Sequence, residues 1–92
     1  MRQFELHITM VGDDDKIRYH TLARGGKYSR IDGDPILGAG IKQYATFHTE
    51  SENPADVINI TKELAEAFSM PEVRVLRFKV EEIIFDSSRG DA

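Results

Sequence analysis

The sequence has no cysteine and no tryptophan, and it has only three prolines. Without thiols, neither disulfide bonds nor a thiolate zinc site can hold the fold. No apolar run approaches the ~20 residues that a membrane-spanning helix needs, and residues 1–5 lack the apolar core of a signal peptide. The fold must therefore rest on apolar burial, and we expect a cytoplasmic protein with no membrane partner, encoded by a cell, a phage or a mobile element.

A strong excess of charge of one sign is also missing. The 92 residues carry 12 basic and 16 acidic side chains, for a formal net charge of −4. A protein that coats nucleic acid needs many cations on phosphates, so this class is disfavoured, although a local basic patch is compatible with the composition. We expect one globular domain over residues 1–86 and a flexible polar tail over residues 87–92.

Two segments alternate apolar and polar side chains, which is typical of strands with one buried face. In residues 4–10 the apolar set and the polar set are Phe4, Leu6, Ile8, Met10 and Glu5, His7, Thr9. Residues 41–49 alternate in the same way, except that Gln43 falls among the apolar positions. We therefore predict two strands that each direct a polar row away from the core.

Residues 54–68 carry the pattern of an amphipathic helix. Asn53 is a favoured N-cap, and Pro54 suits the first helical position. An apolar stripe recurs at three- and four-residue spacing and is predicted to face the core: Val57, Ile60, Leu64 and Phe68, widened by Ile58, Thr61 and Ala65.

Three other segments are less clearly patterned. Asp13 to Asp15 favour a short helix over residues 13–24, although residues 17–21 also fit the arm of a hairpin. We favour the helix. Residues 27–31 read as a short strand and residues 32–40 as a glycine-rich loop. Residues 73–85 are predicted to form one long strand. Its apolar residues change from odd to even positions at Leu76 and back after Glu82, which indicates bulges, or a strand that leaves the sheet edge to meet another subunit.

This succession predicts an α+β fold of the ferredoxin-like βαββαβ type, an antiparallel-rich sheet with its helices on one face. The first strand would lie at the centre, with the 41–49 strand parallel to it on one side and the last strand antiparallel on the other. The polar rows would then share the opposite face, which we call the polar face: Glu5, His7, Thr9, Lys42, Tyr44, Thr46, His48, Arg77, Lys79 and Glu81.

The polar face offers a candidate site. His7 and His48 are a candidate acid–base pair. The candidate ligand-binding residues, which include cations for phosphate or carboxylate and an aromatic ring for a base, are Thr9, Tyr44, Thr46, Arg77 and Lys79. The ordinary alternative is a solvated strand face, in which opposite charges across strands each add roughly 0.2–1 kcal/mol. No third histidine or cysteine stands at metal-ligand spacing, so we expect no metal and no cofactor.

The stretch His7-Ile8-Thr9-Met10 resembles the His-hydrophobic-Thr/Ser-hydrophobic motif of the 2H phosphoesterase family. The resemblance implies that His7 acts as acid or base on a phosphodiester and that Thr9 binds phosphate. Members of that family have two lobes and two such motifs. Here the only other candidate, His48-Thr49-Glu50-Ser51, has Glu where the family has Thr or Ser.

We therefore expect a small non-enzymatic binding or regulatory module that acts through its polar face or glycine-rich loop on a protein or a small anionic ligand. An inhibitor of a host protein, made by a phage or mobile element, belongs to this class. We expect a homodimer through the long C-terminal strand. One alternative is a phosphodiester-handling enzyme that acts on cyclic nucleotides or RNA ends with His7 and His48. A less favoured one is an RNA-binding sheet.

Overall fold

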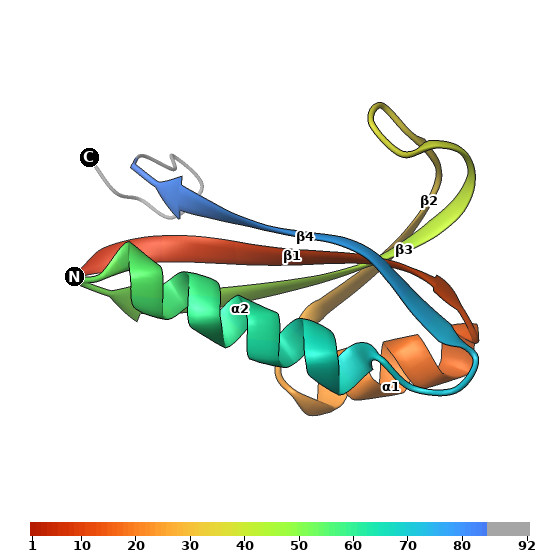
Figure 1. Cartoon of the computed structure of the whole chain (residues 1–92), viewed down its shortest axis with the longest axis horizontal. Coiled ribbons are helices and arrows are strands. Elements are labelled where there is room, and N and C mark those ends of the chain that lie inside the picture. The colour runs from red at the N-terminus through yellow and green to blue at the C-terminus, as the bar shows by residue number, and fades with distance from the viewer. Residues whose placement is uncertain (85–92) are drawn as a thin grey trace.

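A computed structural model of the chain describes residues 1–84. The elements are β1 (Arg2–Gly12), α1 (Asp14–Ala23), β2 (Lys27–Asp34), β3 (Gly38–Ser51), α2 (Pro54–Phe68) and β4 (Val73–Ile83). The strands form one four-stranded sheet in the order β2-β3-β1-β4, and α1 and α2 both lie on one side of it (Figure 1). The fold is therefore α+β. No helix in this part of the chain is long and apolar enough to cross a membrane.

Every strand pair is antiparallel, so the expected parallel pairing of β1 with β3 is wrong. The connections explain the difference. Helix α1 carries the chain back across the sheet, so β2 runs in the same direction as β1. The tight turn after β2 then reverses the chain, and β3 enters beside β1 in the opposite direction.

The ambiguous segment after β1 is the helix α1, as the favoured interpretation has it. Asp13 is its N-cap, because its Oδ1 accepts the backbone N–H of Lys16 at 3.0 Å. Ile17 and Thr21 are fully buried, and the Thr21 hydroxyl donates to the carbonyl of Ile17 at 2.7 Å. A hairpin arm beside β1 is excluded, because the neighbours of β1 are β3 and β4.

Helix α2 begins as predicted, with the Asn53 side chain accepting the N–H of Ala55 at 3.0 Å. Its buried face is narrower than the predicted stripe. Ile58 and Ile60 are 44% and 41% exposed, because they flank the row that packs on the sheet. That row consists of Val57, Thr61, Ala65 and Phe68, with Leu64 partly buried beside it.

Gln43, the polar residue among the apolar positions of β3, forms hydrogen bonds with the last backbone groups of β1. It is 3% exposed. Its Oε1 accepts the N–H of Gly12 at 3.1 Å, and its Nε2 donates to the carbonyl of Gly12 at 2.9 Å. The amide therefore substitutes for a strand partner at the point where β1 turns into α1.

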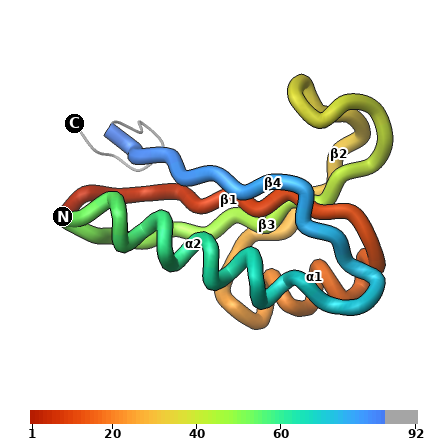
Figure 2. Tube along the Cα trace, viewed as in Figure 1, coloured from red at the N-terminus to blue at the C-terminus, as the bar shows by residue number. Residues whose placement is uncertain are grey.

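The predicted glycine-rich loop is mostly strand. β2 extends to Asp34 and β3 begins at Gly38, which leaves only residues 35–37 between them. The hairpin bends away from the rest of the sheet on the side opposite the helices (Figure 2). Lys42 is 5% exposed there, because its ammonium donates to the carbonyls of three hairpin residues, Gly38, Ala39 and Gly40, at 3.2, 2.7 and 3.2 Å.

The first parity switch in β4 is a bulge, as predicted. Thr9 pairs with Arg77 while Met10 pairs with Val75, so Leu76 is the extra residue. The second switch is not a bulge within the described residues, because the pairing continues regularly to Ile83. Residue 85, the expected end of this strand, and the expected tail at 87–92 lie outside the described residues.

Candidate functional site

The strand register arranges the polar face in three rows that cross β4, β1 and β3. The rows are Glu81–Glu5–His48, Lys79–His7–Thr46 and Arg77–Thr9–Tyr44. Lys42, the tenth residue of the polar face, is held apart by its hairpin carbonyls. The candidate residues that the sequence distributes over three distant segments are thus neighbours on one surface.

Glu5 joins the two candidate histidines. Its Oε2 lies 2.9 Å from Nε2 of His48, and its Oε1 lies 3.8 Å from Nε2 of His7. The two imidazoles approach this carboxylate from β3 and from β1 itself. The structure therefore brings His7 and His48 together around one acid, which the sequence left open.

The two nitrogens of His7 both face protein groups. Nδ1 lies 3.2 Å from the Thr46 hydroxyl oxygen. Nε2 has no solvent contact and makes no hydrogen bond, although Oε1 of Glu81 lies 3.4 Å away, within ion-pair distance. The whole side chain is 22% exposed. A substrate would have to displace Glu81 or Thr46 to reach either nitrogen.

Glu81 also binds the cation that lies beside it on β4, in the neighbouring row. Lys79 Nζ lies 2.8 Å from Glu81 Oε1, and the hydrogen bond from Lys79 holds the pKa of Glu81 below its ordinary value. The charges of Lys79, His7 and Arg77 lower this pKa further. Glu81 is therefore ionised at neutral pH, and the ammonium of Lys79 is already partly neutralised.

The third row lies beside the tip of the β2–β3 hairpin. The Tyr44 hydroxyl donates to Oδ2 of Asp34 at 2.8 Å. Together with the backbone N–H groups of residues 36 and 37, and with the charge of Arg77, this bond lowers the pKa of Asp34 to about 2; the backbone bonds contribute most. Thr9 is only 5% exposed, so a phosphate reaches its hydroxyl only if neighbouring side chains move.

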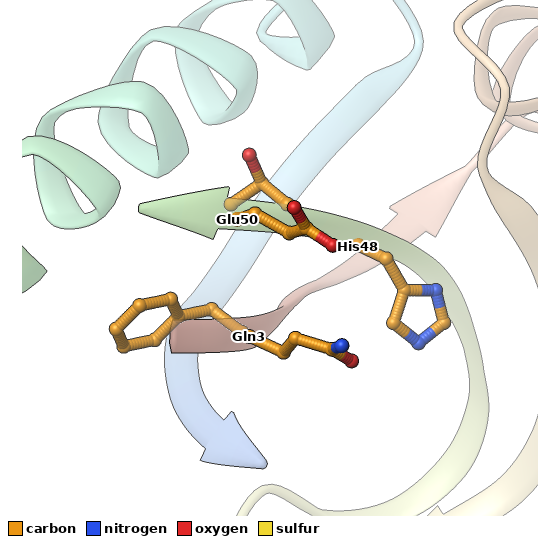
Figure 3. Close-up of a pocket in the computed structure, with 5 residues that line it drawn as sticks. Gln3, His48 and Glu50 are labelled. Carbon is orange, nitrogen blue, oxygen red and sulfur yellow. The ribbon is translucent and has the colours of Figure 1, made fainter. Parts of the chain in front are cut away.

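A hollow of about 430 Å³ lies next to the polar face, where the start of β1 meets the end of β3. It is lined by Gln3, Phe4, His48, Thr49 and Glu50. Figure 3 shows the polar ends of Gln3, His48 and Glu50 directed to the same side, away from α2. Sequence reasoning singled out only His48 of these three. Gln3 and Glu50 share the polar parity of β1 and β3 and pair with each other, so extending the alternation by one pair would have found them.

No group of three or more His, Asp or Glu side chains within residues 1–84 is arranged to hold a metal ion. Two imidazoles and two carboxylates instead follow one another in close contact across the sheet, from His48 through Glu5 and His7 to Glu81. Such an arrangement can present hydrogen-bonding groups of both charges to a partner.

The protein chain matches no protein-family model, no curated protein and no solved structure.

Proposed function

We propose that this chain is a small non-enzymatic binding module that contacts a protein partner through the polar face of its sheet. The observation that carries the proposal is the environment of His7, whose nitrogens face Thr46 and Glu81. A general acid or base needs a nitrogen within hydrogen-bond reach of the reacting group. Both nitrogens of this imidazole instead lie against other residues of the sheet, as expected of a structural residue in a contact surface.

A protein partner is favoured over a small anion because of the charges on this face. The ammonium of Lys79 is paired with Glu81, and Glu5 and Glu50 stand beside the exposed His48. These carboxylates repel an anion, whereas a protein surface can match positive and negative groups at the same time. An inhibitor of a host protein, encoded by a phage or mobile element, is one member of this class.

The finer features of the fold and assembly belong to the same proposal. A ferredoxin-like plan is supported by the βαββαβ succession and by the central place of β1 between β3 and β4. A homodimer through β4 is supported by the position of this strand at the edge of the sheet, where backbone groups are offered to another chain. A cytoplasmic location stays a prediction from the sequence and is part of the same proposal.

A phosphodiester-handling enzyme is the alternative that one observation favours. Glu5 lies 2.9 Å from His48, and a carboxylate that orients an imidazole is a common part of acid–base sites. His48 is 51% exposed and would be the reacting group, with His7 in support. Turnover of cyclic nucleotides or of RNA 2′,3′-cyclic phosphates, lost in His48→Ala, would establish this alternative and refute the binding module.

The binding proposal is tested by affinity capture from a cell lysate with three baits. The first is the unchanged chain. The second carries His48→Ala and Lys79→Ala on the polar face, and the third carries Lys62→Ala and Glu63→Ala on the exposed side of α2. We expect one protein to be recovered with the first and third baits and lost with the second. Equal recovery with all three baits would show that the polar face is not the contact surface.

A further inference from the structure

One edge of the sheet is regular and the other is not. Strand β4 is at one end of the strand order, and its residues Arg77–Ile83 pair with β1 without a register shift. Strand β2, at the other end, has an irregularity between Asp32 and Asp34, where the hairpin bends away. A regular edge strand is a template for pairing with another strand, so β4 is the edge on which an added strand fits.

The charges along this regular segment allow a second copy, running in the opposite direction, to place a negative side chain opposite a positive one. On the polar face it presents Arg77, Lys79 and Glu81, which reads plus, plus, minus. On the other face it presents Phe78, which is 38% exposed, Val80, which packs at the margin of the core, and Glu82. Ile83 ends the polar-face row of the segment. An antiparallel copy of the same strand can therefore bring Lys79 opposite Glu81 and Val80 opposite Val80, with Phe78 opposite Glu82 and Arg77 opposite Ile83.

The register of such a pair follows from the rule that like charges directly opposite each other are destabilising. A two-fold axis at Val80 places Lys79 opposite the partner's Glu81, twice, and Val80 opposite the partner's Val80. An axis at Lys79 or at Glu81 would place a charged residue opposite its own copy. An axis at Phe78 would place Arg77 opposite the partner's Lys79. Among these registers only the one centred on Val80 has no like-charge pair.

We propose that a second copy of this chain pairs with β4 in antiparallel orientation about a two-fold axis at Val80, perpendicular to the sheet. This inference rests on the homodimer in the proposed function and specifies its register. The two four-stranded sheets then form one continuous sheet with the helices of both copies on the same side. The polar faces become one surface that carries the Glu5–His48 pair twice, so a two-fold symmetric partner would find two identical sites.

Cysteine cross-linking tests the register directly, because the chain has no cysteine of its own. Residues directly opposite each other in antiparallel strands have Cα atoms roughly 4.5–5.5 Å apart, within the range of a disulfide. We expect Val80→Cys to form a covalent dimer under mild oxidation that a reductant reverses. Lys79→Cys is the matched control, because in this register the two copies of residue 79 are diagonal neighbours and not directly opposite each other. We expect its yield of covalent dimer to be less than a tenth of the yield from Val80→Cys.

The mass of the chain in solution and two charge-reversal variants complete the test. By light scattering, the unchanged chain should have twice the monomer mass of 10.4 kDa. Lys79→Glu should weaken the dimer at least tenfold, and adding Glu81→Lys should restore it.

A monomer at high micromolar concentration would overturn both this inference and the homodimer. A dimer that cross-links through Lys79→Cys, and not through Val80→Cys, would overturn the register alone. A monomeric chain that still recovers a protein through the polar face would keep the binding module and lose only the dimer.

Discussion

The carboxylate of Glu5 on β1 lies 2.9 Å from Nε2 of His48 on β3. The two residues are directly opposite each other in the antiparallel register. Because His48 is 51% exposed, this pair is part of the surface that a partner would meet. His7, which also approaches this carboxylate, is 22% exposed and lies between Lys79 and Thr46 in the neighbouring row. The two histidines of the candidate site therefore have different environments.

We predict that the two histidine substitutions separate stability from binding. His48→Ala should change the free energy of unfolding by no more than about 0.5 kcal/mol, as is usual for an exposed residue. His7→Ala should cost about 1–2 kcal/mol, because it removes the contact with Thr46 and leaves Glu81 with fewer partners. Urea unfolding of both variants measures the difference. Equal costs would mean that His7 has no special structural role.

Gly12, at the end of β1, is predicted to tolerate substitution poorly. Its φ is +149°, and a Cβ there would lie 2.1 Å from the carbonyl oxygen of Glu72. That oxygen accepts the N–H of Asp13 at 2.8 Å, so it cannot move away without loss of the bond. Gly12→Ala should therefore cost more than about 3 kcal/mol or prevent folding.

Gly25→Ala is the matched control for Gly12. Gly25 also has a positive φ, +77°, but an added Cβ would meet no atom within 4 Å. Only the conformational cost of a left-handed residue remains, roughly 1–2 kcal/mol. Thermal and chemical unfolding of the two variants give the comparison. A Gly12 variant as stable as the Gly25 variant would show that the contact with Glu72 relaxes easily.

Gln43 is predicted to stabilise the chain through its amide rather than through its bulk. Gln43→Met keeps a similar volume and removes both hydrogen bonds to Gly12, so it should cost about 1–2 kcal/mol. Gln43→Glu should cost more, because it loses the donor and places a carboxylate near Asp14, 3.5 Å from the present amide nitrogen. Urea unfolding at neutral pH measures both costs. A methionine variant as stable as the original would contradict the assignment.

The hairpin tip is predicted to contribute pH-dependent stability through Asp34. The pKa of this carboxyl is lowered from 3.8 to about 2, mainly by the backbone N–H groups of Leu37 and Ile36 and then by the Tyr44 hydroxyl. Because the folded-state pKa is below the unfolded value, the contribution is fully present above pH 4 and is lost as the pH falls toward 2.

The acid limb of the stability curve checks this prediction. Other carboxyls with lowered pKa values, those of Asp14, Glu81 and Glu82, also contribute to the loss of stability in acid. We therefore compare the unchanged chain with Asp34→Asn between pH 5 and pH 2. The variant should be less stable at pH 5, and its stability should fall less steeply below pH 4. Parallel curves would exclude a role for Asp34 in the pH dependence.

The local patterns were informative because they depend only on neighbouring residues. The alternation in residues 4–10 correctly assigned the buried face of β1, and Asn53 with Pro54 correctly marked the start of α2. The width of the buried stripe on α2 was overestimated at Ile58 and Ile60, because the pattern cannot tell how much of a helix the sheet covers. The strands within residues 32–40 were not predicted, because glycines are equally compatible with a loop and with a bent hairpin.

The sequence by itself determined which side chains share a face, because a strand repeats every two residues whatever it pairs with. It identified the polar face and its candidate residues on that basis. The tertiary structure alone decided which of them meet. The antiparallel entry of β3 sets Glu5 opposite His48, and β4 brings Glu81 to His7. Direction and register depend on connections and on contacts between residues distant in sequence, so the difference between His7 and His48 cannot be read from either strand alone.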